Sequence, residues 1–314
     1  MMIYIGALII IVIASITYLI YCFYINWYSI SNGNDANDYL LKDNKDNKDN
    51  KDIKDITEKY ENNDHIYFMT YKETAKFFTN DTDMYVRNMT DLDLHARKVK
   101  TYMEYINNIE DTAISFTDDE KDLLTKCAEN ADIYLRKETF KELKYADYID
   151  GNNIADIKWI FANTYANRFN DILKENEEGL PHTRENIIFL SKNVLKYDEL
   201  NLTNTLIHEK IHIYQRNNSK IFDKIISNMG LKELDKNSYK YAKFIRSNPD
   251  TNNKIYYAEI NTDDVMVCLY RNTNPNGIND VIHNNYAKEH PYEKIAYEIA
   301  ENFHKNNKDK YINI

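Results

Sequence analysis

The sequence predicts an α+β fold that is rich in helix. Only 4 prolines and 6 glycines occur among 314 residues, so few positions force the backbone out of a helix. Apolar residues recur at helical spacing over long stretches, whereas short runs of β-branched and aromatic residues at 154–161 and 187–190 are typical of strands. We therefore expect helices joined by turns rich in Asn and Asp, around a small sheet.

Residues 1–25 predict a transmembrane helix. The segment is rich in Ile, has no charged side chain and ends in a cluster of aromatic residues. A span of this length crosses a bilayer as a helix of about 20 residues, and aromatic side chains suit the interface. A cleaved secretion signal is the alternative, but the apolar run exceeds the usual length of about 7–15 residues and no small-residue cleavage site follows it.

The charges that flank this segment bear on its orientation. No Lys or Arg precedes Lys42, whereas Asp35 and Asp38 follow the apolar run. The terminal amine is then the only positive charge near one end, which favours that end on the cytosolic side. We expect a single-pass membrane protein whose main domain lies on the lumenal or external side.

Residues 26–60 predict a polar, disordered linker. Lys-Asp-Asn triplets repeat from Lys42 to Asp55, alternate in charge and offer little to bury. Such a segment can hold a domain away from a membrane surface.

The composition excludes one class of partner and leaves the redox state open. The net charge of −10 opposes nucleic acid binding, because that function usually needs a basic surface to neutralise phosphates. We therefore expect no nucleic acid partner. The three cysteines are compatible with one disulfide or with none.

Residues 61–150 predict a helical region without a catalytic pattern. Apolar residues at helical spacing mark 71–78, 91–109 and 118–137. The last stretch opens at Thr117 with Glu120 three residues later, which is typical of a helix start. We place a second domain at 151–314, where strand-like and helical stretches alternate.

One helical stretch of the second domain carries a metal-binding pattern. His208, Glu209 and His212 form an H-E-x-x-H motif. On a helix, positions i and i+4 lie on the same face, so both histidines can direct a ring nitrogen at one metal ion while Glu209 sits beside it. Apolar neighbours predict that this helix is buried: Leu206, Ile207, Ile211 and Ile213.

The H-E-x-x-H motif resembles the active-site helix of zincin metallopeptidases, in which both histidines bind zinc and the glutamate is the general base. The resemblance implies that His208 and His212 are zinc ligands and that Glu209 deprotonates a zinc-bound water, whose pKa falls to about 7. The implied reaction is hydrolysis of a peptide bond. The implied fold is a zincin-like domain with a small edge sheet over the motif helix.

The third ligand must come from another segment, since the longer metzincin motif with a third histidine is absent. Pro291 can open a helix whose first turn contains Glu293, and Ala296 belongs to a small apolar face that can pack closely on the motif helix. The spacing of Glu293 and Ala296 is similar to the E-x-x-A of several zincin families, in which that glutamate is the third ligand. We therefore predict Glu293 as the third zinc ligand.

Other residues remain candidates for this ligand. Glu259 is a rival because its separation from the motif is closer to that of thermolysin-like enzymes. His283 and His290 are weaker rivals, since lone histidines are more often hydrogen-bonded polar groups than ligands. Glu298 and Glu301 are better explained as surface carboxylates paired with neighbouring lysines.

The segment before the motif predicts a strand. In zincins an edge strand precedes the motif helix and pairs with an extended substrate, and the apolar run 185–191 is well placed for that strand. A buried strand with no substrate role is the alternative. Candidates for the donor that stabilises a developing oxyanion are Tyr292, His290 and His182.

These observations favour a membrane-anchored zinc metalloendopeptidase that acts on a protein or peptide substrate. The alternative is a catalytically inactive zincin-like module that binds a partner or has a structural role at a membrane. The coordination distinguishes the two, because three protein ligands plus water support catalysis, whereas a fourth protein ligand closes the site.

Overall fold

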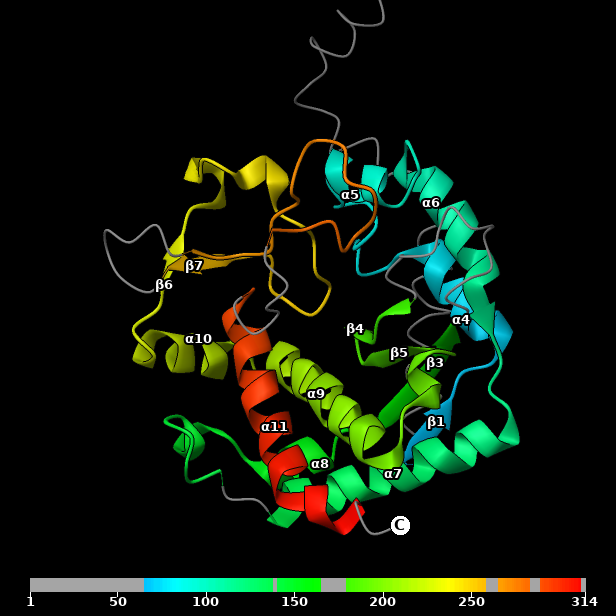
Figure 1. Cartoon of the computed structure of the whole chain (residues 1–314), viewed down its shortest axis with the longest axis vertical. Coiled ribbons are helices and arrows are strands. Elements are labelled where there is room, and N and C mark those ends of the chain that lie inside the picture. The colour runs from blue at the N-terminus through cyan, green and yellow to red at the C-terminus, as the bar shows by residue number, and fades with distance from the viewer. Residues whose placement is uncertain (1–64, 138–139, 165–178, 258–264, 283–288, 312–314) are drawn as a thin grey trace, which may run out of the picture. The chain divides into compact units, whose positions relative to one another are not determined.

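The computed structural model describes residues 65–137, 140–164, 179–257, 265–282 and 289–311, which belong to one compact unit, Asp64–Ile314 (Figure 1). The anchor predicted at 1–25 and the linker predicted at 26–60 lie outside the described residues. Within the described part of the chain, no helix combines the length and the apolar character needed to cross a membrane.

The fold is mixed α/β, about half helical, and contains a larger and a smaller sheet. In the larger sheet, β1 (Ile66–Phe68), β3 (Trp159–Thr164) and β5 (Ile187–Ser191) run parallel in that order. β4 (His182–Arg184) pairs antiparallel with β5 at one edge, and β2 (Ala113–Ile114) pairs antiparallel with β3. The smaller, antiparallel sheet is made of β6 (Lys232–Leu234), β7 (Ile255–Tyr257) and β8 (Val265–Met266).

Helices lie between β1 and β2, between β2 and β3, and between β5 and β6 in the chain. The α-helices of the described residues are α4 (Tyr71–Asn80), α5 (Asp91–Ala96), α6 (Tyr102–Ile109), α7 (Asp118–Lys137), α8 (Gly151–Ala155), α9 (Glu199–Asn217), α10 (Ser219–Asn228) and α11 (Pro291–Tyr311). Short 3₁₀ turns lie at Glu110–Thr112, Ala146–Tyr148, Val194–Lys196, Lys236–Ser238 and Ala242–Phe244. Side-chain oxygens cap several helix starts; Thr70, for example, accepts a hydrogen bond from the backbone N–H of Glu73.

The helices predicted at 71–78 and 118–137 are confirmed as α4 and α7. At the start of α7, the backbone N–H of Thr117 donates to Glu120 Oε2 (2.8 Å), as the sequence pattern predicts. The stretch 91–109 is instead divided into α5 and α6. The break occurs because Lys98 adopts a φ of 59° and Thr101 then caps a new helix by accepting from the N–H of Glu104.

The strand predicted at 154–161 begins later, at Trp159, because the preceding residues form α8. The side chain of Asp150 caps the start of this short helix by accepting hydrogen bonds from the backbone N–H groups of Asn152 and Asn153. A Cβ on Gly151 would lie 2.0 Å from the carbonyl oxygen of Leu135, so only glycine fits where α8 meets the end of α7.

The region predicted to be helical, 61–150, and the domain predicted at 151–314 share one core. β1 and β2 of the first region pair with β3 of the second, and α7 packs on α9. The first region therefore also supplies strands, because β3 needs partners along its second edge. Two buried cysteines of the described residues, Cys127 and Cys268, are free thiols.

The core positions α9 beside α11 (Figure 1). The buried face of α9 carries Leu202, Leu206, Ile207, Ile211 and Ile213, and that of α11 carries Ile295, Ala296, Ile299 and Ala300, all without solvent exposure. The small apolar face predicted in the last helix is thus confirmed. Ala296 and Ala300 leave room for the two helices to approach closely.

The prediction that 185–191 is an edge strand is wrong. β5 lies between β3 and β4, and each of its five residues is buried. The edge is formed by β4, because the chain reverses direction at Glu185, whose φ is 52°, and lays 182–184 along the free side of β5. The alternative interpretation of 185–191, a buried strand, agrees with the structure.

Candidate metal centre

The H-E-x-x-H motif lies in the middle of α9, on the side that faces α11. Asp198 begins the helix by accepting a hydrogen bond from the N–H of Asn201, and apolar side chains then bury the following turns. His212 is 1% exposed and Glu209 is 3% exposed. Both polar side chains are therefore held inside the protein, where they need specific partners.

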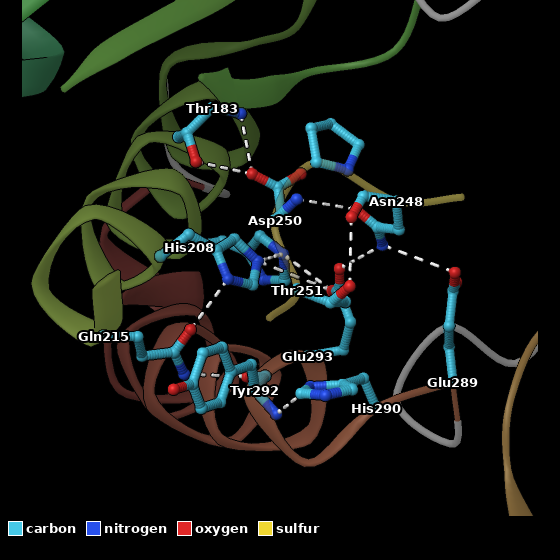
Figure 2. A network of polar contacts seen from close by, with 12 residues as sticks. Thr183, His208, Gln215, Asn248, Asp250, Thr251, Glu289, His290, Tyr292 and Glu293 are labelled. Atoms are coloured by element: carbon cyan, nitrogen blue, oxygen red, sulfur yellow. Dashed lines mark hydrogen bonds and ion pairs between the residues drawn. The ribbon is translucent and has the colours of Figure 1, made fainter. Parts of the chain in front are cut away.

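The structure brings His208, His212 and Glu293 together, and one potential ligand atom from each lies within 4.8 Å of the others. The two Nε2 atoms are 2.9 Å apart, and Glu293 Oε2 lies 3.3 Å from that of His208 and 3.5 Å from that of His212. Glu293 reaches this point because it lies in the first turn of α11, which packs on α9. Figure 2 shows His208 and Glu293 on facing elements.

Hydrogen bonds behind the cluster determine which atoms face its centre. His212 Nδ1 donates to Gln215 Oε1 (2.8 Å), and Gln215 Nε2 donates to the carbonyl oxygen of Tyr292 (2.9 Å). When the His212 ring is neutral, its Nε2 lone pair therefore points toward His208 and Glu293. Asn248 Nδ2 donates to Glu293 Oε1 (2.8 Å), which leaves Oε2 directed at the histidines (Figure 2). Two imidazole nitrogens and one carboxylate oxygen are a donor set that suits a divalent transition metal.

Glu209 stands beside this cluster without a hydrogen bond to its Oε2 atom from any described residue. Burial raises the pKa of its carboxyl group well above the usual range, and the carboxylate of Asp250 raises it further. A carboxylate with a raised pKa is a better proton acceptor than an exposed one. Glu209 therefore has the burial and the basicity of a group that takes up a proton.

The pKa values of the three clustered residues depend on one another. Burial raises the pKa of Glu293, but the neighbouring histidines, His212 first, outweigh it and hold the pKa well below its usual range. Burial lowers the pKa of His212, yet Glu293 and Asp250 outweigh it and bring that pKa to about 10. Burial lowers the pKa of His208. A metal ion would have to displace the proton from His212, so metal binding and proton release are linked.

A cavity of about 300 Å³ opens onto the cluster. Its lining comes mainly from the segment before β4, from α9, from the segment 246–250 and from α11. The lining residues are Leu180, Pro181, His182, Tyr197, Asn204, Thr205, His208, Glu209, Arg246, Ser247, Asn248, Pro249, Asp250, Ile278, Glu293 and Tyr297. This volume is near the lower end of pockets that hold small ligands, which span about 300–1,000 Å³.

The other candidate ligands either have different partners or lie outside the described residues. His290 is bonded on both ring nitrogens, to Asn252 Oδ1 (2.9 Å) and to the N–H of Tyr292 (3.0 Å), so it is a hydrogen-bonded structural group. Glu298 accepts a hydrogen bond from Tyr145 (2.6 Å), and Glu301 pairs with a lysine one turn away on α11 (3.0 Å). Glu259 and His283 lie outside the described residues.

Of the three predicted oxyanion donors, only His182 lines the cavity. Its Nδ1 atom donates to the carbonyl oxygen of Leu180 (3.0 Å), so its Nε2 atom can donate only when the ring is doubly protonated. Tyr292 instead packs its ring against Phe222, with the ring centroids 5.7 Å apart.

Sequence reasoning missed four residues of the site. Tyr297 places its ring 4.4 Å from that of His208 and lines the cavity; its spacing of four residues from Glu293 is a helical signal that could have found it. Gln215 likewise follows His212 by three residues on α9. Asn248 and Asp250 belong to a segment far from both helices in sequence, and no local pattern points to their role.

Comparison of the chain with family models, with curated proteins and with solved structures gave no match. The function is therefore inferred from the geometry and chemistry of the site.

Proposed function

We propose that the chain is a metal-dependent peptidase whose ligands are His208, His212 and Glu293, with zinc as the ion. The observation that carries this proposal is the convergence of these three donors beside a buried carboxylate, Glu209, at the wall of a cavity. Within the described residues, no fourth His, Cys, Asp or Glu belongs to the group. Three protein ligands with space beside them are typical of catalytic zinc sites.

The ion, when bound, would act as a Lewis acid that lowers the pKa of a water molecule and polarises the scissile carbonyl group. The protein would supply the remaining functions. Glu209 would accept a proton from the attacking water and return it to the departing amine nitrogen. Tyr297, on the cavity wall beside His208, is the donor that we propose for the developing negative charge on the carbonyl oxygen.

The position of the site supports a peptide as the substrate. The cavity lies between the start of β4, helix α9 and the segment 246–250, so a ligand can enter beside the sheet. Its walls combine apolar side chains, such as those of Leu180 and Ile278, with many polar and charged ones, which suits a ligand that has both apolar side chains and a polar backbone. A zincin-like arrangement of motif helix, second ligand helix and sheet, together with the membrane anchor expected at 1–25, belongs to the same proposal.

The decisive experiment compares the full-length chain with its Glu209→Gln and His212→Ala variants. We expect about one zinc per chain in wild type and Glu209→Gln, and loss of zinc in His212→Ala. Glu209→Gln should reduce zinc-dependent hydrolysis of peptides from digested casein by about 10²–10⁴-fold, because the proton acceptor is removed while the ligands remain.

Each result has a distinct meaning. Stoichiometric zinc in His212→Ala would remove the proposed site. Normal zinc binding without peptide hydrolysis by wild type would favour the non-catalytic module instead.

A further inference from the structure

The outer edge of β4 is occupied by side chains of the protein itself. The N–H of Thr183 points away from β5 and donates to Asp250 Oδ1 (2.7 Å), which also accepts from the Thr183 hydroxyl group (2.5 Å). The carbonyl oxygen of Thr183 accepts from Arg216 Nη2 (3.4 Å). β4 spans three residues, so Thr183 supplies its only outward N–H, and that donor is in use.

The positions on either side of Thr183 offer little more to an added strand. Toward the cavity, the next outward residue is Pro181, which has no N–H. Toward the hairpin turn, the carbonyl oxygen of Glu185 accepts a hydrogen bond from Arg216 Nη1. An extended peptide that pairs with a sheet edge needs a row of free donors and acceptors, and this edge does not provide one.

The segment that closes the edge is held at each residue from 247 to 250. Ser247 donates from its N–H and its hydroxyl group to Asp93 (3.0 and 2.7 Å), and Asn248 donates to Glu293. The carbonyl oxygen of Pro249 accepts from Arg216 Nη2 (3.2 Å), and Asp250 binds Thr183. Figure 2 shows this chain of contacts from Thr183 through Asp250 and Asn248 to Glu293.

The two aspartates that hold the segment 247–250 in place are buried. Asp93 has no solvent exposure, and Asp250 is 8% exposed. To open the edge, a substrate would have to leave these buried charges without their hydrogen bonds, which is costly. The closed edge is therefore a stable part of the site.

We infer that the substrate of the proposed peptidase is a short peptide held within the cavity, and not an extended strand added to β4. This inference rests on the proposed function. The cavity of about 300 Å³ accommodates only the residues next to the scissile bond, and recognition comes from side chains such as Leu180, Ile278 and Tyr297. Residues of a longer peptide find no row of free donors and acceptors along β4, so they add no binding there.

The test is a length series with the zinc-loaded full-length chain. The probes are nested peptides of four to twelve residues, centred on the bond that the enzyme cleaves fastest in digested casein. We expect kcat/KM to vary less than about threefold across the series. Binding of fluorescently labelled four- and twelve-residue peptides to zinc-loaded Glu209→Gln should agree within the same factor.

A matched pair of variants tests the role of Asp250. Asp250→Ala frees the N–H of Thr183, the one outward donor of β4, while Arg216 still holds the carbonyl oxygen. The variant should raise the ratio of kcat/KM for twelve-residue over four-residue peptides by up to about tenfold, because the longer peptide gains that one hydrogen bond. Asp250→Asn keeps an acceptor oxygen and should retain the wild-type ratio. The ratio within one variant cancels any effect of Asp250 on the chemical step.

Failure of the inference is distinguishable from failure of the proposed function. Zinc-dependent cleavage by wild type that rises tenfold or more from four to twelve residues overturns the short-peptide inference alone, even if Asp250→Ala does not fold. An unchanged ratio in folded Asp250→Ala removes Asp250 as the closing group. The absence of zinc-dependent cleavage and binding for every peptide rejects the proposed function, and the inference with it.

Discussion

At the residue scale, the side chains that hydrogen-bond to the candidate ligands determine which ligand atoms face the centre of the site. Gln215 accepts from Nδ1 of His212, so a neutral ring has its lone pair on Nε2, and Asn248 determines which oxygen of Glu293 faces the histidines. Each of the two amides is held by a second contact, since Gln215 donates to the carbonyl oxygen of Tyr292 and Asn248 also approaches Glu289 Oε1 (3.4 Å). The ligand atoms are therefore oriented before any ion arrives.

Loss of these orienting amides should weaken metal binding. We expect Gln215→Ala and Asn248→Ala each to lower zinc affinity about 10–100-fold, because His212 or Glu293 loses the hydrogen bond that fixes its orientation. Competition with a chromogenic chelator measures this affinity. Gln215→Glu keeps an acceptor for His212 and should lose less; wild-type affinity in both alanine variants would contradict the orienting role.

At the scale of elements, the site depends on the contact between α9 and α11. The histidines belong to one helix and Glu293 to the other, so the distance between the helices sets the distance between ligands. Ala296 and Ala300 are fully buried at this contact. Larger side chains there would separate the helices, since protein cores have little free volume.

Enlarging the contact should affect stability and metal binding together. Ala300→Leu is expected to reduce the free energy of unfolding by about 1–3 kcal/mol, because the added atoms force α11 away from α9. Zinc affinity should fall as well, since Glu293 moves with α11. Urea unfolding and chelator competition provide the two measurements.

The control for this variant is Glu301→Leu, at an exposed position of the same helix. It should change the free energy of unfolding by less than about 0.5 kcal/mol and leave zinc affinity unchanged. If Ala300→Leu were as stable as this control, the close approach of the helices would not be a requirement of the site.

At the scale of the whole molecule, hydrogen bonds to a buried carboxylate connect the wall of the site to α5. Asp93, in α5, accepts hydrogen bonds from Ser247 and from the Tyr270 hydroxyl group (3.0 Å) and lies 3.9 Å from Arg97. Burial raises the pKa of Asp93, but Arg97 and the hydrogen bonds outweigh it and hold the pKa below its usual value of 3.8. The charged form is thus the one that the folded protein stabilises.

This depressed pKa predicts the pH dependence of stability. An acid whose pKa is lower in the folded state contributes stability that is present above the unfolded value and lost as pH falls through the folded pKa. Asp93 should therefore stabilise the protein above about pH 4 and lose that effect below it. Asp93→Asn should reduce the free energy of unfolding by about 1–3 kcal/mol at pH 7, with a smaller difference from wild type at pH 3.

Thermal or urea unfolding from pH 7 to pH 3 measures this difference. Asp91→Asn, at an exposed position of the same helix, is the control and should follow wild type at both pH values. A constant gap between wild type and Asp93→Asn across the whole range would show that the hydrogen bonds matter and the charge does not.

Local patterns in the sequence determined the parts of this protein that depend on near neighbours in the chain. The common helix face of His208 and His212 follows from the i, i+4 geometry of any helix, and Thr117 with Glu120 marks the start of α7 for the same local reason. The apolar face of α11 is also periodic, so its burial was predictable. Periodicity could equally place Glu293 in a first helical turn, although it could not bring that residue to the histidines by itself.

Only the tertiary structure decided what depends on segments far apart in the chain. The contact of Asn248 with Glu293 and that of Asp250 with Thr183 arise from packing between elements separated by dozens of residues. An Asn-Pro-Asp segment reads as a turn wherever it occurs, so the sequence contains no sign that this turn closes a sheet edge. Hydrogen bonds of this kind are selected by which buried polar groups remain to be satisfied once the core has formed, and that is a property of the folded molecule.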